Sequence, residues 1–316
     1  MDISNNLKTT SKNIVINDHN NYLEIWPDSG GIINIWKIRT SDGWRDIIIG
    51  YEDQIDFKEN CEKKGFRSCK LSPYVCRIRD GKYIWNNKEY QIGKFGFDRH
   101  KIHGLMYDLK YDLKEININP VDNSAKVHLH QLYNGSKEGF PFEIDIDIHY
   151  RLEEGSELSI ETIITNRSSI NMPICDGWHP YFSLGENLNT CELKINSNEL
   201  IELDKELIPT KKIKPFKRFQ QPEKIGDYFF DNCFKVRTND EASCEFSDPV
   251  SGITLHIYPD ENYPYLQLFT PDDRKSIAIE CLSAVPDAFN NEIGLIQLMP
   301  KENTSFKCKY VVNTKF

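Results

Sequence analysis

The chain has 316 residues, a formal net charge of −9 at neutral pH, 39% hydrophobic residues and 12% aromatic residues. This supply of apolar side chains excludes a wholly disordered chain, and the acidic total argues against nucleic acid or an anionic membrane as a partner. The longest apolar runs, such as residues 46–50, are far shorter than the ~20 residues that a membrane span needs. We therefore expect a soluble globular protein.

Alternation of apolar and polar residues dominates the chain. In chain order it is found at residues 126–132, 142–152, 158–164, 253–258, 265–270, 276–281 and 305–312. A period of two places successive side chains on opposite faces, which predicts half-buried strands. The second and third of these segments flank the turn Glu154-Gly155-Ser156, so we expect them to form an antiparallel hairpin.

Turn residues separate the strand-like segments along the whole chain, and long amphipathic helical patterns are nearly absent. The turns include Asp42-Gly43, Asp80-Gly81, Asn134-Gly135 and Ser251-Gly252. Many short strands with regular turns predict an all-β fold, a sandwich or barrel of antiparallel sheets, and we expect one domain over residues 1–316. The basic stretch 211–218 has a loop-like composition, and we expect a solvated loop there in preference to an anion site.

The start of the chain and the cysteines indicate the compartment. Residues 1–6 lack the basic and apolar stretches of a signal peptide. Nine cysteines are an odd number and no C-x-x-C occurs, which favours reduced, mostly buried thiols in a cytoplasmic protein. A cysteine nucleophile is the less favoured alternative, because no cysteine has a neighbouring base in the sequence.

Three histidines lie on strand-like segments. His128 and His130 are two residues apart and share a face, which suits a metal ion, and His149 lies on the next segment. No carboxylate or third ligand accompanies them at a fixed spacing. We therefore favour solvent-facing or hydrogen-bonded histidines over a metal site.

Two further residues are candidates for proton transfer. His179 precedes Pro180, which restricts it to an extended conformation, and aromatic residues surround it; such a histidine suits a general acid beside a sugar, or equally a core position. Glu280 shares a strand face with the small residues Ser276 and Ala278, which leave room for a ligand. A buried Glu280 would be a base with a perturbed pKa, and a surface strand residue is the alternative.

Together and in this order, these elements resemble the aldose 1-epimerase (galactose mutarotase) family. The segment HPYFSL at 179–184 is similar to the family motif H-P-Y-F-N-L. Further similarities, over roughly residues 20 to 315, are 30–34 (early glycine strand), 71–83 (N-R-I-x-x-G-x-F/Y), 102–104 (L-H-G-G), 230–234 (D-H-N-F), 265–270 (L-Q-x-Y-T) and 280–290 (E-T-Q-x-x-P-D-A-x-N). The resemblance implies a large antiparallel β-sandwich, the galactose mutarotase-like supersandwich.

The sequence departs from the family pattern around the expected pocket. Cys76 replaces the Asn before the motif arginine, Leu105 replaces the second Gly after His103, and Leu282 replaces the Gln after the motif glutamate. These changes leave the proton-transfer pair in place and alter the pocket rim, so the resemblance does not fix the sugar.

The resemblance also implies a mechanism that moves only protons and needs no metal and no nucleotide or other cofactor. Glu280 would act as base at the sugar O1 and His179 as acid at O5, while His103 would hydrogen-bond the sugar near the reacting centre. Arg77 and Asp231 would hold ring hydroxyls, with Gln267 a weaker candidate for that role. The expected partner is a small-molecule sugar, of galactose or glucose type; the sequence gives no oligomeric state.

Two alternatives remain beside a mutarotase of free aldoses. The first is a hexose-6-phosphate 1-epimerase, whose phosphate clamp could come from the basic segment near Lys211 or from an arginine among Arg67, Arg77, Arg79 and Arg99. The second is a carbohydrate-binding protein of the same fold without turnover. Since a binder needs no acid–base pair, the presence of both motif residues favours an enzyme. If the protein is such an enzyme, its site residues should converge on one concave, aromatic-lined face of the sheet: Arg77, His103, His179, Asp231 and Glu280.

Overall fold

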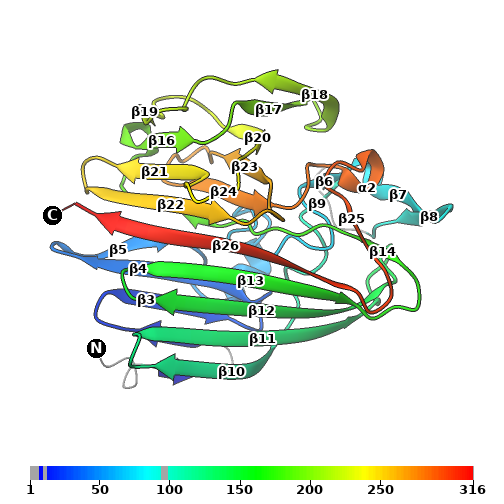
Figure 1. The fold of residues 1–316 in the computed structure, drawn as a ribbon, viewed down its shortest axis with the longest axis horizontal. Coiled ribbons are helices and arrows are strands. Elements are labelled where there is room, and N and C mark those ends of the chain that lie inside the picture. Colours follow the sequence, from blue (N-terminus) through cyan, green and yellow to red (C-terminus); the bar gives the residue numbers. More distant parts are fainter. Residues whose placement is uncertain (1–6, 10–12, 94–98, 316) are drawn as a thin grey trace.

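The computed structural model describes residues 7–9, 13–93 and 99–315. The prediction about a signal peptide concerns residues 1–6, which lie outside the described residues. About half of the described chain forms strands, and most of these strands assemble into two large sheets (Figure 1). Within that part of the chain, no helix has the length and apolar character needed to cross a bilayer.

The larger sheet has eleven strands, paired antiparallel throughout. Their order across the sheet is β1 (Leu7–Thr9), β2 (Ile14–Asn17), β3 (Asn21–Trp26), β4 (Ile32–Thr40), β5 (Gly43–Ile48), β15 (Tyr181–Phe182), β24 (Ile277–Leu282), β23 (Tyr265–Phe269), β20 (Asp231–Lys235), β17 (Glu199–Leu203) and β18 (Pro209–Pro215). The centre of this sheet is therefore built from strands that lie far apart in the sequence.

The second sheet has nine strands and lies across the front in Figure 1. Their order is β10 (Asp112–Asn119), β11 (Ser124–Asn134), β12 (Glu143–Glu153), β13 (Glu157–Asn166), β26 (Asn303–Thr314), β22 (Ile253–Pro259), β21 (Cys244–Asp248), β16 (Glu192–Ile195) and β19 (Glu223–Lys224). The small two-stranded sheets pair β14 (Met172–Ile174) with β25 (Ile296–Leu298), β6 (Arg77–Ile78) with β9 (Lys101–Ile102), and β7 (Lys82–Trp85) with β8 (Lys88–Gln91). The described helices are short: α1 (Gln54–Asn60), α2 (Ala288–Asn291) and the 3₁₀ turns Arg79–Gly81 and Leu188–Thr190.

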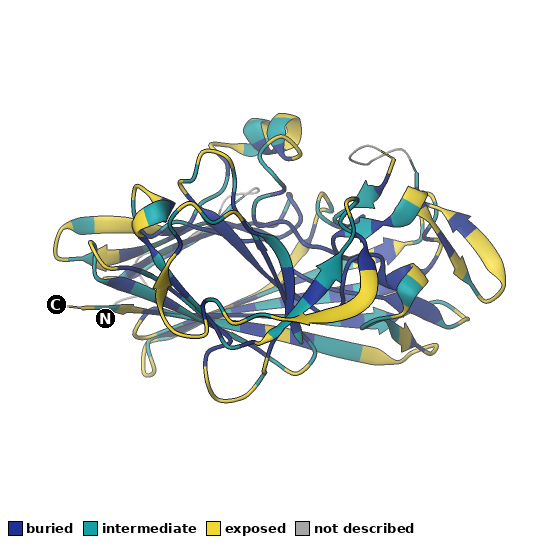
Figure 2. Cartoon of the chain, turned by 90° about the horizontal axis from the view of Figure 1, so that it is seen from above, coloured by how far each residue is buried: buried dark blue, intermediate teal, exposed yellow. Residues whose placement is uncertain are grey.

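The two large sheets pack against each other, with the core between them. The rings of Phe182 in β15 and Tyr310 in β26 have centroids 5.4 Å apart, and the thiols of Cys281 in β24 and Cys308 in β26 are 2.8 Å apart. Buried residues follow the layer between the sheets, and exposed residues gather on the connecting loops and outer strands (Figure 2). The predicted large antiparallel β-sandwich is confirmed.

The alternating pattern places side chains as expected in the nine-stranded sheet. In β12 the side chains of Ile144, Ile146 and Ile148 are fully buried, while the intervening Asp145 and Asp147 face outward and are half-buried. β12 and β13 pair antiparallel in continuous register, which confirms the predicted hairpin.

The basic stretch 211–218 was expected to be a solvated loop, and this prediction is wrong for its first half. Residues up to Pro215 belong to β18, which pairs with β17 as the outermost strand of the eleven-stranded sheet. Its residues from Thr210 onward are exposed on both faces, so no alternation marks the strand in the sequence. Lysine and proline are common on such edge strands, because they discourage pairing with another chain.

The histidines His128, His130 and His149 lie on the outer face of the nine-stranded sheet. His128 Nε2 is 2.6 Å and His130 Nδ1 3.2 Å from Oδ1 of Asp147, and the rings of His128 and His149 stack with centroids 4.2 Å apart. Asp147 belongs to the neighbouring strand β12, which is why no fixed spacing in the sequence revealed it. The favoured prediction of partly exposed, hydrogen-bonded histidines agrees with this arrangement.

All nine cysteines are buried and none is in a disulfide. The prediction of buried, unpaired thiols is therefore confirmed. Burial raises the pKa of the Cys76 thiol well above its ordinary value, and the negative charge of Glu280 adds to this shift. A thiol that stays protonated is a poor nucleophile, which weakens the cysteine alternative further.

Candidate active site

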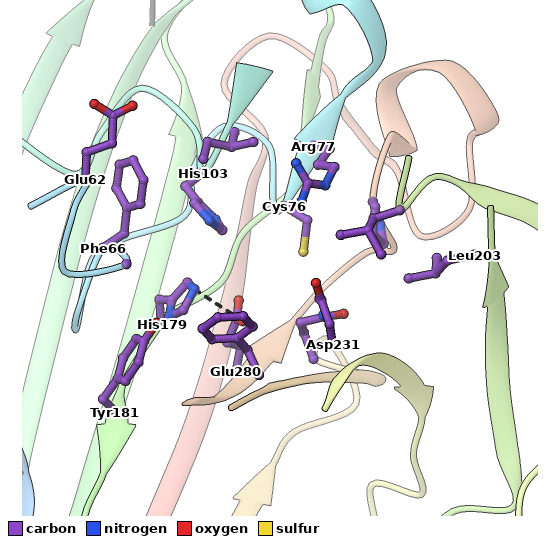
Figure 3. A pocket seen from close by; sticks show the side chains of 16 residues that line it. Glu62, Phe66, Cys76, Arg77, His103, His179, Tyr181, Leu203, Asp231 and Glu280 are labelled. Atoms are coloured by element: carbon purple, nitrogen blue, oxygen red, sulfur yellow. Dashed lines mark hydrogen bonds and ion pairs between the residues drawn. The ribbon is translucent and has the colours of Figure 1, made fainter. Parts of the chain in front are cut away.

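A cavity of about 220 Å³ is lined by residues of the small β6–β9 sheet and of the strands β24, β23 and β20 in the eleven-stranded sheet. Its lining contains all six residues that the sequence singled out: Arg77, His103, His179, Asp231, Gln267 and Glu280. The structure thus brings together residues up to two hundred positions apart in the sequence. Figure 3 shows how the labelled side chains converge.

Three of these side chains come from neighbouring strands. Glu280 lies on β24 and Gln267 directly opposite it on β23, while Asp231 is the first residue of the next strand, β20. Gln267 Nε2 donates a hydrogen bond of 2.8 Å to Asp231 Oδ1. Glu280 is 1% exposed, because both faces of β24 are covered; the surface alternative considered from the sequence is wrong.

His179 is fixed by its backbone and by stacking. Its N–H donates to Cys69 O at 3.1 Å, and its C=O accepts from Ser68 N at 2.8 Å. Its ring stacks on Tyr181 with centroids 5.2 Å apart and planes 8° apart. In this position His179 Nε2 lies 3.3 Å from Glu280 Oε1 (Figure 3).

Arg77 belongs to the small sheet formed by β6 and β9, and His103 directly follows β9. Arg77 pairs with Ile102 in this sheet, and His103 N donates to Cys76 O at 2.8 Å. The chain turns sharply after His103, where Gly104 has φ +77°. Only glycine fits this position, because a Cβ there would lie 2.3 Å from Ser72 O. This turn brings the His103 ring edge-on to the His179 ring, with centroids 4.9 Å apart.

Burial shifts the ionisation of the central groups toward their neutral forms. It raises the pKa of Glu280 well above its ordinary value, and the charge of Asp231 adds to the shift. It lowers the pKa of His179 to about 4 and that of His103 well below its ordinary value, with the neighbouring His179 and Arg77 contributing to the latter. A carboxyl with a raised pKa is a stronger base when ionised, and a neutral imidazole beside it is ready to exchange a proton.

Several buried polar atoms of the cavity have no hydrogen-bond partner within the described protein. They are Nδ1 of His103, Nδ1 of His179, Oε1 of Gln267 and Oε2 of Glu280. Leaving a buried polar group unpaired costs about 1–3 kcal/mol, and such groups are rare in native folds. Their concentration in one cavity indicates a ligand with several hydrogen-bonding groups.

The cavity also has an apolar wall, which the sequence did not reveal. Leu203 lines it from the end of β17, Leu207 from the turn between β17 and β18, and Phe269 from β23. Ion pairs fix this turn to the opposite side of the cavity: Arg79 with Asp204 at 3.1 Å, Arg79 with Glu206 at 3.3 Å, and Arg99 with Glu206 at 3.0 Å. The partners lie more than a hundred residues apart, so no local pattern marks them.

The residues proposed from the sequence as a phosphate clamp do not gather in the cavity. Only Arg77 of the four arginines lines it. Arg79 and Arg99 are engaged in the ion pairs of the β17–β18 turn, and the Arg67 guanidinium lies over the Tyr181 ring, 5.6 Å from its centroid. Lys211 lies on β18 and does not line the cavity.

The fold is a large antiparallel β-sandwich, and the imidazole of His179 and the carboxyl group of Glu280 are in contact at the centre of its cavity. The family model described as aldose 1-epimerase matches residues 12–311, nearly the whole chain, and the chain belongs to this family. Among its relatives, the aldose 1-epimerase of Streptococcus thermophilus is 26% identical over 286 residues, covering 78% of each chain. Human galactose mutarotase is 21% identical over 244 residues, covering 71% of this chain and 67% of its own.

Solved structures show the same fold. A galactose mutarotase-like protein from Clostridium acetobutylicum superposes with a TM-score of 0.84 at 20% identity, covering 98% of each chain. Galactose 1-epimerase from Lactobacillus acidophilus superposes with a TM-score of 0.79 at 17% identity, covering 96% of this chain and 95% of its own. The sequence resemblance to the family and its fold is therefore confirmed.

Proposed function

We propose that the protein is an aldose 1-epimerase that interconverts the α and β anomers of a free, neutral aldose of galactose or glucose type. The observation that carries this proposal is the buried pair of His179 and Glu280, with Nε2 and Oε1 3.3 Å apart in a cavity of sugar size. A general acid and a general base must each lie within hydrogen-bond reach of the reacting atoms, and this pair can meet the adjacent O5 and O1 of one sugar ring.

In the proposed reaction the pair of Glu280 and His179 holds one proton, which passes from Glu280 to His179 across their 3.3 Å contact. The Glu280 carboxylate then accepts the proton of the anomeric hydroxyl while the His179 imidazolium gives its proton to the ring oxygen. The C1–O5 bond breaks and a C1 aldehyde with a free O5 hydroxyl forms. Rotation about C1–C2 then presents the other face of the aldehyde, and O5 attacks C1 again as both protons return. Protons are conserved, and neither a redox partner nor a nucleotide enters the balance.

The remaining polar residues hold the sugar. His103 hydrogen-bonds near the reacting centre and supports the charge that develops there. Arg77 and Asp231 bind ring hydroxyls, and Gln267, which is bonded to Asp231, presents its unpaired Oε1 to another hydroxyl donor. A sugar offers a donor and an acceptor in each hydroxyl, which suits a site where several polar atoms lack partners.

The charges of the cavity favour a neutral aldose over a hexose 6-phosphate. Apart from the two imidazoles, Arg77 is the one basic side chain among the described residues that line the cavity. The same lining has three carboxyl groups, those of Glu62, Asp231 and Glu280. A phosphate dianion would meet these carboxyl groups without a cluster of arginines to offset them. A sugar-binding protein without turnover is also disfavoured, because hydroxyl contacts alone do not need a buried acid–base pair.

The proposal is tested by the rate of anomer exchange. Freshly dissolved α-anomers of a panel of aldoses and hexose 6-phosphates would be followed by polarimetry and by exchange NMR, with and without protein. We expect acceleration for at least one neutral aldose, with competition by its other anomer and no need for an added cofactor. Binding of sugars without any acceleration would support the binding-protein alternative, and acceleration confined to hexose 6-phosphates would support the phosphate alternative.

A further inference from the structure

The centre of the cavity also has the donor set of a transition-metal site. We propose that His103, His179 and Glu280 bind a divalent transition-metal ion such as Zn²⁺, reversibly and in competition with the sugar. The ligating atoms of all three residues lie within 4.8 Å of one another. The inference rests on the site of the proposed function but concerns how that site is inhibited.

The spacing of these groups is close to that of ligands on one ion. Zinc binds nitrogen and oxygen at ~2.0–2.2 Å, so tetrahedral neighbours are about 3.4 Å apart. The His179–Glu280 separation of 3.3 Å already matches this value. His103 approaches edge-on to His179 and needs only a small side-chain shift to complete the set. Two imidazoles and one carboxylate suit Zn²⁺, Co²⁺ or Cu²⁺, whereas Mg²⁺ and Ca²⁺ favour oxygen ligands.

The surroundings allow such an ion but do not favour permanent occupation. Nδ1 of His103 and Oε2 of Glu280 have no partner within the described protein, so the contact that the ion must replace is the one between His179 Nε2 and Glu280 Oε1. Arg77 opposes a cation, and the nearby Asp231 favours one. A histidine that binds a metal through one ring nitrogen usually donates a hydrogen bond from the other. His179 would bind through Nε2, which faces Glu280, and its Nδ1 has no such acceptor in the described protein, which costs about 10- to 100-fold in metal affinity.

A bound ion would inhibit proton transfer. It would use the lone pairs with which Glu280 accepts a proton and His179 exchanges one, and it would occupy the place of the sugar O1 and O5. Sugar and metal therefore exclude each other, and added metal should lower the rate of anomer exchange. Removal of metal by a chelator should restore it.

The experiment titrates metal-free protein with Zn²⁺, with Mg²⁺ as the control ion, and measures anomer exchange at several sugar concentrations. We expect inhibition by Zn²⁺ only, an apparent inhibition constant that rises linearly with sugar concentration, and full recovery after chelation. Co²⁺ provides a second readout, because its visible absorption reports coordination whether or not the protein turns over. Absence of binding, or inhibition that sugar does not relieve, would overturn the inference.

Variants locate the ion. Glu280→Gln and His103→Ala each remove a ligand. Each should therefore weaken Co²⁺ binding by at least about 10- to 100-fold, the loss that follows when only an outer hydrogen-bond partner of a ligand is removed. The matched control is His128→Ala on the outer sheet face, where His128, His130 and Asp147 form another polar cluster. Binding lost in His128→Ala but kept in Glu280→Gln would place the ion on that face and overturn the inference. If the parent protein binds Co²⁺ through Glu280 but never exchanges anomers, the inference stands and the proposed function fails.

Discussion

The segment that leads to His179, called the inner end of the site below, and the rim of the cavity are held by ion pairs of opposite character. At the inner end, Lys70 and Asp176 form a pair that is fully buried, and Tyr263 Oη donates a further hydrogen bond of 2.6 Å to Asp176. This pair flanks the segment of His179, since Lys70 forms a β-bridge with Trp178. At the rim, Arg79, Asp204 and Glu206 are each about a third exposed.

The difference shows which part of the site is rigid and which is adjustable. Breaking a buried ion pair leaves an uncompensated charge inside the protein, whereas exposed pairs contribute little because water screens them. We therefore expect changes at the inner end to affect chemistry and folding, and changes at the rim to affect sugar affinity. The predictions below test this division, beginning with the largest effect.

The largest expected effect is loss of the acid–base pair. Glu280→Gln removes the proton acceptor with little change of shape, and His179→Asn removes the imidazole. Each positioned acid or base contributes about 10²–10⁴-fold to rate. Each variant should lose anomer-exchange rate by a factor in that range, as measured by polarimetry, with a much smaller change in sugar affinity.

The double variant and a matched control sharpen this prediction. The combined loss in rate should be smaller than the product of the two single losses, because an acid without its base is of little use. Glu292→Gln alters an exposed carboxylate at the end of α2 and should leave the rate near that of the parent. Parent-like exchange by Glu280→Gln would contradict the proposed mechanism.

The second prediction concerns the buried ion pair. Lys70→Met leaves Asp176 without its cation in a place with no exposure, which should destabilise the fold by about 3–5 kcal/mol in denaturant unfolding. The double variant Lys70→Met/Asp176→Leu should recover part of this loss, because neither charge remains. Lys82→Met, which breaks an exposed pair with Glu89, is the control and should cost about 1 kcal/mol or less. Equal losses for Lys70→Met and Lys82→Met would remove the distinction between the two kinds of ion pair.

The sequence predicted the inner end of the site better than its rim, for a physical reason. Glu280 lies in a strand with an alternating pattern, and His179 precedes Pro180 among aromatic residues, so the local sequence already marks both as candidates. The burial of Glu280 could not be predicted from its strand, because it depends on residues from distant segments, such as His179 and Arg77, that line the same cavity. Tertiary packing, rather than alternation within the strand, decides which face is exposed.

The rim was not predictable because its contacts are non-local. The segment 211–218 has no alternation, since the edge strand β18 is exposed on both faces, and its composition predicts a loop where the structure has a strand up to Pro215. The ion pairs that fix the preceding turn join Arg79 and Arg99 to carboxylates more than a hundred residues away. Arginines that looked available for a phosphate are therefore already engaged.

The third prediction concerns that rim. Arg79→Gln removes two ion pairs that hold Leu203 and Leu207 at the cavity, at a cost of about 1 kcal/mol, which corresponds to roughly a fivefold change in an equilibrium constant. We expect KM to rise by about that factor with kcat nearly unchanged, because the acid–base pair does not move. High salt should raise the KM of the parent in the same direction by screening the same pairs.

Two variants separate this positioning role from a direct contact with substrate. Glu206→Gln should also raise KM, since it breaks the Arg79–Glu206 pair from the other side and the Arg99–Glu206 pair with it, whereas Lys82→Gln should not. A large fall in kcat for Arg79→Gln with no change in KM would show that the rim takes part in the chemistry. Selective loss of affinity for sugar phosphates would instead make Arg79 a phosphate ligand.

The smallest expected effect belongs to Cys76, which lines the cavity beside Arg77 (Figure 3). Its thiol stays protonated, because burial and the charge of Glu280 raise its pKa well above the ordinary value. A protonated thiol neither attacks the anomeric carbon nor competes with a carboxylate as base.

Cys76→Ala should therefore change kcat/KM by less than about threefold, since the proton-transfer contributions of about 10²–10⁴-fold come from other groups. Loss of exchange in Cys76→Ala with normal folding would transfer the chemistry to this thiol. A parent-like rate would support His179 and Glu280 as the proton-transfer groups. Cys76 would then affect only how the sugar packs in the cavity.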